Sequence, residues 1–101
     1  MMLRSNAYRA WTMIDVIGVK RLGAHRLEIT FSDGSVGIRD LVDMVAREGE
    51  MVRPLKDPPY FARVFIEDGA LTWPNGYDVD PIELHRTMKE AGQLRRTDAA
   101  E

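Results

Sequence analysis

The chain has 101 residues, of which 45% are hydrophobic and 30% are charged, and it contains no cysteine. This length supports one small core, so we expect a single domain, and the missing cysteines exclude disulfides, thiolate catalysis and cysteine-ligated zinc. The formal net charge of −2 gives no general attraction to nucleic acid, so we expect nucleic-acid binding only with the help of a partner. No apolar run reaches about 18 residues, and the sequence therefore predicts a cytoplasmic protein that does not contact a membrane.

The N-terminal residues 1–12 carry only scattered apolar side chains, which indicates a flexible arm. A single α+β domain is predicted over residues 13–92. Its first strand is expected at residues 14–20, because this stretch is apolar and β-branched.

The second strand has the clearest pattern in the chain. Leu27, Ile29 and Phe31 alternate with polar residues, so we expect one face of this strand to be buried. Asp33-Gly34 follows, and this dipeptide favours a tight hairpin turn into an antiparallel return strand.

Two short helical segments are predicted in the middle of the chain. The first covers residues 41–47, and Asp40 is expected to cap it. The second is a single turn at residues 58–62, which Asp57 is expected to cap and an aromatic residue to anchor.

A second hairpin follows these helices. A strand at residues 64–67, the turn Asp68-Gly69 and a strand at residues 70–73 repeat the earlier pattern. Strands joined by tight turns pair antiparallel, so the predicted fold is α+β. We expect one antiparallel sheet of about five strands, with the short middle helix and a C-terminal helix packed on one face.

The C-terminal helix is predicted from local signals over residues 81–91. Asp80 is expected to cap it, with Glu83 reaching back as in a capping box. Leu84 and Met88 fall on one face and should be buried. A polar tail is expected over residues 93–101, and its arginines are interpreted as solvated charges at a helix end.

Three stretches together resemble the domain of unknown function 2442 family, which consists of small bacterial proteins. They are FSDGSVGIRDL at 31–41, PLKDPPYFARVFIEDG at 54–69 and LTWPNGYDVDPIELH at 71–85. The family pattern is an F-x-DG hairpin, a PL-x-D-P-x-x-F connection and a W-P-NG-x-D turn, in that order. The resemblance implies an antiparallel α+β fold and no established enzyme activity. It also implies a gene context like that of toxin–antitoxin pairs, with a small partner protein encoded nearby.

One group of side chains is a candidate for chemistry, namely Asp78, Asp80, Glu83 and His85. Carboxylates beside an imidazole are typical of an acid/base pair or a hard-metal site. Capping and turn formation already account for the three carboxylates, and His85 has no second histidine one helical turn away. We therefore predict no catalytic residue, no metal site and no cofactor.

The candidate binding residues are Trp73, Asn75, Tyr77 and Asp78, which surround the predicted Pro-Asn-Gly turn. Tryptophan is frequent at interface hot spots, but a tryptophan at a strand end is more often part of the core. We expect Trp73 to be buried, with its indole N–H bonded to a turn carbonyl.

Two classes of function remain open. The first is a non-enzymatic, antitoxin-like interaction module that holds a small basic protein, or a second copy of itself, at a sheet edge. The strands at 14–20 and 64–67 are the candidate edges, because unpaired edges tend to bind another chain. The alternative is a small ligand-binding domain or hydrolase that uses the region of Asp78, Asp80 and His85.

Overall fold

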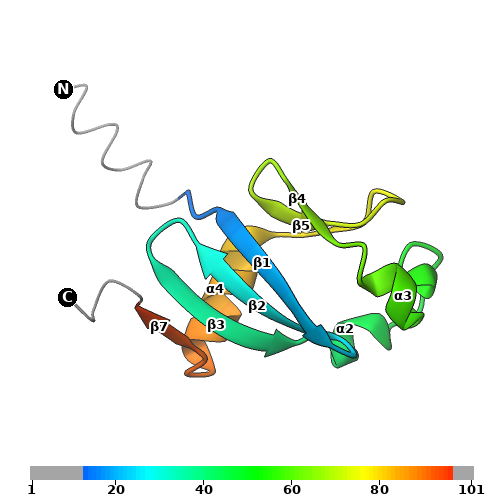
Figure 1. Ribbon diagram of the computed structural model, residues 1–101, viewed down its shortest axis with the longest axis horizontal. Helices are drawn as coiled ribbons and strands as arrows, with labels where there is room; N and C mark the ends of the chain where they lie inside the picture. The colour runs from blue at the N-terminus through cyan, green and yellow to red at the C-terminus, as the bar shows by residue number, and fades with distance from the viewer. Residues whose placement is uncertain (1–12, 97–101) are drawn as a thin grey trace.

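The computed structural model describes residues 13–96, so the predicted arm at residues 1–12 and the last part of the predicted tail, residues 97–101, lie outside the described residues. The described chain has an α+β fold (Figure 1). Its elements, in chain order, are β1 (Val16–Gly23), β2 (Arg26–Phe31), β3 (Ser35–Asp40), α2 (Val42–Val45), the 3-10 helix η1 (Arg53–Lys56), α3 (Pro58–Phe61), β4 (Phe65–Glu67), β5 (Ala70–Thr72), β6 (Asp78–Val79), α4 (Pro81–Glu90) and β7 (Leu94–Arg96).

The strands form two antiparallel sheets, where the sequence predicts a single sheet of about five strands. One sheet has the order β1-β2-β3-β7, and the other has the order β4-β5-β6. β1 passes beside β4, but the two do not form a ladder, and Val16 N–H donates to the Gly69 carbonyl at 2.8 Å. The sheets therefore meet at a corner. Apolar alternation within a strand does not show which strands pair with each other. The sequence therefore could not distinguish one sheet from two.

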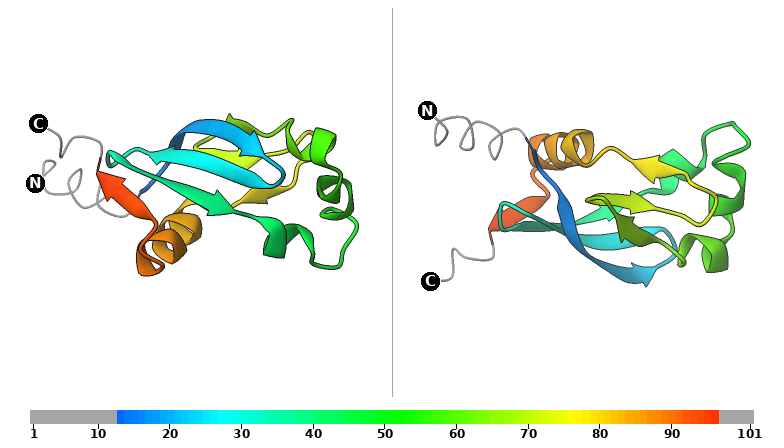
Figure 2. Two further views of the ribbon diagram at one scale, coloured as in Figure 1. Left: turned by 60° about the horizontal axis from the view of Figure 1, so that its bottom comes forward. Right: turned by 90° about the horizontal axis from the view of Figure 1, so that it is seen from above.

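The core lies between the four-stranded sheet, α4 and the three-stranded sheet. Leu27, Ile29 and Phe31 are fully buried, which confirms the alternation predicted for β2. α4 lies behind the sheet in Figure 1, and Figure 2 shows the same helix from two further sides. Its residues Leu84 and Met88 pack into the same core, as their spacing predicts.

Short connections join the strand pairs. Residues 32–34 link β2 to β3, and Gly34 has a φ of 92°. Asp68 and Gly69 link β4 to β5 with φ values of 53° and 78°. A tight turn with positive φ at two successive residues matches the twist of the flanking strands. Aspartate and glycine tolerate positive φ better than most residues.

Trp73 is fully buried, which confirms its predicted place in the core. Its indole N–H donates to the carbonyl of Phe61 at 2.9 Å, an acceptor at the end of α3 rather than in the adjoining turn. The ring lies 5.4 Å from that of Phe61 and 6.1 Å from that of Tyr77. One side chain thus joins α3 to the β4-β5-β6 sheet.

The helix caps agree with the predictions only in part. Asp80 accepts a hydrogen bond from Ile82 N–H at 3.0 Å and caps α4 as predicted. Asp57 precedes α3, but its side chain makes no capping bond. Glu83 pairs with Arg86 at 2.5 Å and so serves as an ion-pair partner in place of the predicted capping box. No helix within residues 13–96 is long and apolar enough to cross a membrane.

The predicted polar tail begins too early, because Leu94–Arg96 form β7 and pair antiparallel with β3. Gly92 has a φ of 72°, and Gln93 N–H donates to the Met88 carbonyl at 2.9 Å, so the chain reverses directly after α4. Backbone hydrogen bonds hold this strand, and its arginines give no apolar alternation by which a sequence pattern would reveal it.

Gly37 explains how closely β7 approaches β3. A Cβ built at Gly37 would collide with the carbonyl of Gln93 and lie 3.1 Å from the Leu94 side chain. We expect Gly37→Ala to lower the free energy of unfolding by about 1–3 kcal/mol, because buried backbone must move apart to admit the methyl group.

The matched control is Gly18→Ala in β1, where the new methyl group would meet Thr30 at an ordinary contact distance of 3.4 Å. Chemical denaturation of both variants makes the comparison. Equal stability of Gly37→Ala and the unmodified protein would contradict the close packing of β7 on β3.

Candidate functional site

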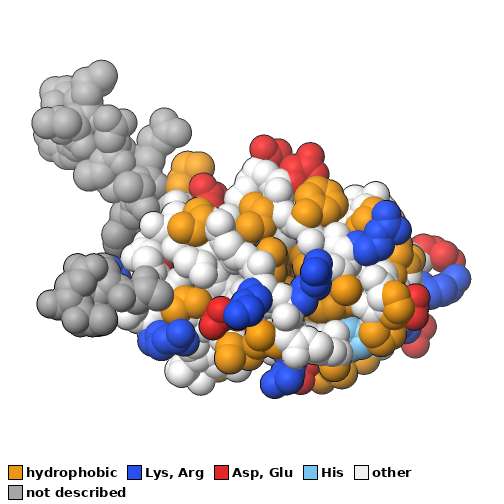
Figure 3. All heavy atoms as spheres, viewed as in Figure 1, with side chains coloured by type: hydrophobic (Ala, Val, Ile, Leu, Met, Phe, Trp, Pro, Cys, Tyr) orange, Lys and Arg blue, Asp and Glu red, His pale blue; other side chains and the backbone are white. Residues whose placement is uncertain are grey.

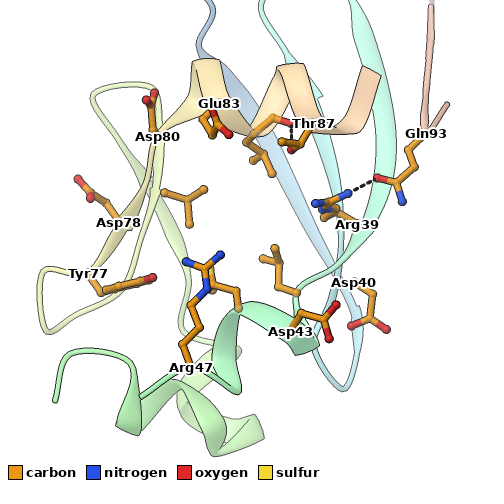
Figure 4. Close-up of a pocket in the computed structure, with 14 residues that line it drawn as sticks. Arg39, Asp40, Asp43, Arg47, Tyr77, Asp78, Asp80, Glu83, Thr87 and Gln93 are labelled. Carbon is orange, nitrogen blue, oxygen red and sulfur yellow. Dashed lines mark hydrogen bonds between the residues drawn. The ribbon is translucent and has the colours of Figure 1, made fainter. Parts of the chain in front are cut away.

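A groove of about 500 Å³ opens between the end of β3, the α2 segment, β6 and α4 (Figure 4). Charged side chains dominate its lining. The carboxylates are those of Asp40, Asp43, Asp78, Asp80 and Glu83, and the guanidinium groups are those of Arg39 and Arg47. Carboxylates therefore outnumber guanidinium groups five to two.

The two arginines of the groove differ in their bonding. Arg39 stands near the end of β3 and donates to the Gln93 side chain at 2.9 Å. Arg47 follows α2, and its side chain makes no hydrogen bond or ion pair with any residue in the described range 13–96. Figure 4 shows Arg47 pointing into the groove toward Tyr77. Its guanidinium group is thus available to a bound molecule.

The turn between β5 and β6 places Tyr77 at the groove. Gly76 N–H donates to the Trp73 carbonyl at 2.8 Å, and Tyr77 N–H donates to the Asn75 side chain at 3.1 Å. The Asn75 amide in turn donates to the Met51 carbonyl at 2.9 Å, which ties the turn to the preceding loop. The turn is therefore held from both sides, and Tyr77 starts from a fixed backbone position.

β6 exposes one edge of its backbone beside the groove. Trp73 N–H donates to the Tyr77 carbonyl at 2.9 Å, and the register continues with the pairs Thr72–Asp78 and Leu71–Val79. Paired residues of an antiparallel ladder alternate between hydrogen-bonded and non-hydrogen-bonded pairs. Asp78 belongs to a non-hydrogen-bonded pair, so its N–H and C=O point away from β5.

The edges predicted to bind a partner, residues 14–20 and 64–67, face each other instead. Besides the bond from Val16 to Gly69, the Arg21 side chain donates to the Ala62 carbonyl at 2.7 Å across the same corner. Figure 3 shows hydrophobic side chains over the region in which β1 passes β4, and the exposed apolar residues include Ile17 and Phe65. Only one backbone hydrogen bond joins this corner among the described residues, and the role of these two edges in binding a partner stays a prediction.

His85 belongs to a different cluster from the groove. It lies 3.0 Å from the Asp33 carboxylate, and the Ser35 hydroxyl donates to the other oxygen of that carboxylate at 2.6 Å. This pair borders a hollow of about 230 Å³, which Lys89 and Arg95 also line. Burial acts to raise the pKa of Asp33, but the hydrogen bonds from Ser35 and His85 outweigh it and hold the pKa below its ordinary value of 3.8.

The structure thus separates the predicted chemical group. Asp78, Asp80 and Glu83 share the groove, while His85 pairs with Asp33 outside it. Within the described residues, no three histidine or acidic side chains are arranged to hold a metal ion.

Two of the four candidate binding residues do not line the groove. Trp73 has no exposed surface, and the Asn75 side chain is occupied within the protein. Tyr77 and Asp78 both line the groove. The sequence reasoning missed Arg39, Asp43 and Arg47, although the spacing of Asp43 and Arg47 by one helical turn would have placed both on one side of the predicted middle helix.

These features define a small α+β domain in which two antiparallel sheets meet at a corner and an open edge strand borders a charged groove. The sequence matches the family described as protein of unknown function (DUF2442) over residues 16–90, and the chain belongs to this family. The match confirms the resemblance carried by the three motifs. No curated protein and no solved structure matches the chain.

The depressed pKa of Asp33 makes stability depend on pH in acid. Because the folded protein favours the ionised carboxylate, the stabilisation is present above the ordinary pKa of 3.8 and is lost as the pH falls through the lower folded value. Asp33→Asn keeps an acceptor for Ser35 but removes the charge. We expect the variant to be less stable at neutral pH and to lose less stability on acidification.

Urea denaturation across the acid range measures this effect. Asp43→Asn is the control, because the Asp43 side chain makes no hydrogen bond or ion pair with the described residues. A pH profile of Asp33→Asn that coincides with that of the unmodified protein would refute the role of the Asp33–His85 pair.

Proposed function

We propose that this protein is a non-enzymatic interaction module that holds a small basic protein in the groove beside β6. The observation that carries the proposal is the outward-facing backbone of Asp78 at the border of a charged groove. An unpaired strand edge offers hydrogen-bond donors and acceptors to another chain, and many recognition domains use such an edge. The family resemblance supports an antitoxin-like role toward a partner encoded nearby.

The charge of the groove supports a basic partner. Glu83 is paired with Arg86, but the other four lining carboxylates make no ion pair within residues 13–96. Asp78 and Asp80 lie on one side of the groove and Asp40 and Asp43 on the other (Figure 4), so a cationic partner would meet carboxylates on both sides. Complementary charge also accelerates encounter, so association should slow as salt is added.

The arrangement of polar groups supports binding over catalysis. No histidine lines the groove. At the second cluster, the Ser35 hydroxyl donates to Asp33 rather than to His85, so the imidazole does not activate it. The side chains proposed for a hydrolase therefore stand in separate places, and Tyr77 and Asp78 fit a contact surface better.

A matched pair of charge reversals tests the proposal. Asp43→Lys places a cation in the groove, and Glu48→Lys makes the same change of net charge at an exposed residue that does not line it. We expect the product of the adjacent gene to bind the unmodified protein and Glu48→Lys alike. Asp43→Lys should weaken binding at least about tenfold, because it converts attraction into repulsion.

Isothermal titration calorimetry with the purified partner provides the measurement, and circular dichroism verifies that both variants fold. Equal affinity of the two variants would overturn the assignment of the groove. Hydrolytic turnover by the purified protein that a substitution at Asp78 or His85 abolishes would overturn the non-enzymatic role.

A further inference from the structure

We infer that the groove takes an extended segment of the partner as an additional strand beside β6, with lysine or arginine at alternate positions. This inference rests on the proposed function and specifies the chemistry of what is bound. Its starting point is the backbone of Asp78, whose N–H and C=O point away from β5. Both groups of one residue face the same way at an open edge, which is the arrangement that an incoming strand pairs with.

The side chains of β6 indicate in which direction the side chains of an added strand would point. Tyr77 and Val79 are partly buried and pack against the core, whereas Asp78 is exposed. Figure 4 shows Tyr77 directed into the groove and the Asp78 side chain directed away from its centre. A strand beside β6 continues this alternation, so every second side chain of the segment enters the groove.

The inner side chains of such a segment meet a predominantly acidic wall. Asp40 at the end of β3 and Asp43 in α2 lie on the wall opposite Tyr77, and Glu83 lies on α4 (Figure 4). Tyr77 offers an aromatic face, which also attracts a cation. A lysine or arginine at an inner position therefore has the Tyr77 ring on one side and the carboxylates of the opposite wall on the other.

The two arginines of the groove do not reverse this preference, because the lining carboxylates outnumber them five to two. Arg39 is bonded to Gln93, and Arg47 extends from the opposite wall toward Tyr77. Arg47 instead restricts the register of the segment, because a cationic side chain directly opposite it would be repelled. We therefore expect a backbone carbonyl of the segment to be placed opposite Arg47.

The edge of β7 is less suited to this partner. β7 carries Arg95, and the hollow beside it also contains Lys89. These cations would repel a basic segment. Charge thus distinguishes β6 from β7, although both edges expose backbone groups.

The test uses two variants that share the same loss of charge. Asp78→Ala removes the carboxylate and keeps the backbone amide, whereas Asp78→Pro removes the carboxylate and the amide proton. Proline is tolerated where the N–H of an edge strand faces outward, so Asp78→Pro should retain the fold. Circular dichroism and a melting curve verify this.

The probe is a fluorescein-labelled peptide of alternating valine and arginine, and its binding is followed by fluorescence anisotropy. We expect Asp78→Ala to bind it more weakly than the unmodified protein, because one of the lining carboxylates is lost. Asp78→Pro should bind at least about tenfold more weakly than Asp78→Ala, because a strand-pairing bond is missing. The same peptide with glutamate in place of arginine should not bind.

A second measurement leaves the protein unchanged and therefore holds even if Asp78→Pro fails to fold. Two peptides are made, each with a methyl group on every second backbone nitrogen. In one frame the odd-numbered nitrogens are methylated, and in the other the even-numbered ones are. One frame should abolish binding and the other should preserve it, since only alternate amides of the peptide face β6.

Equal binding of the peptide by the two Asp78 variants, or equal binding of the two methylated frames, would overturn strand addition. Binding of the glutamate peptide as tightly as the arginine peptide would overturn the basic specificity. In each of these cases the proposed function still stands if Asp43→Lys blocks the native partner, and it fails if that variant has no effect.

Discussion

The buried indole of Trp73 is the interaction on which the rest of the structure depends. Its N–H donates to the Phe61 carbonyl, and its ring packs between Phe61 and Tyr77. The backbone of the same residue donates to Tyr77 and accepts from Gly76, so it also closes the turn that leads into β6. Loss of this side chain would remove a large apolar area from the core and leave a buried carbonyl without a donor. One residue thus fixes α3, the turn and the edge strand together.

The groove is a consequence of this arrangement. β6 has two residues, and so short a strand has little stability of its own. Its position is set at one end by the Trp73 turn, which Asn75 fastens to Met51, and at the other by Asp80 at the cap of α4. A short strand held at both ends keeps its outer backbone groups free. The charged lining keeps the groove solvated, since carboxylates lacking ion-pair partners are costly to bury.

The predictions from sequence succeeded where one local signal determines one local structure. The alternation of Leu27, Ile29 and Phe31 identified the buried face of β2, and the Asp80-Pro81 pair identified the start of α4. Each of these patterns depends on neighbours within a few residues. The resemblance to the family rests on the same local motifs and is confirmed by the match over residues 16–90.

The predictions failed where the structure depends on contacts between residues that are far apart in the sequence. The division into two sheets and the strand β7 follow from which edges meet, and β7 contains arginines that no strand pattern reveals. Proximity in the sequence groups His85 with Asp78, but α4 directs His85 toward Asp33, 52 residues away in the chain. Arg39 and Arg47 reach the groove from separate elements, and only the folded chain brings them into one groove with Tyr77.

The open edge of β6 is the central claim, and amide hydrogen exchange of the isolated protein tests it most directly. The ladder directs the Val79 N–H toward β5 and the Asp78 N–H toward solvent. NMR detection of a nitrogen-15-labelled sample should therefore show slow exchange at Val79 and nearly unprotected exchange at Asp78, with protection of Asp78 appearing once the partner binds. Equal protection of the two amides in the free protein would contradict the account.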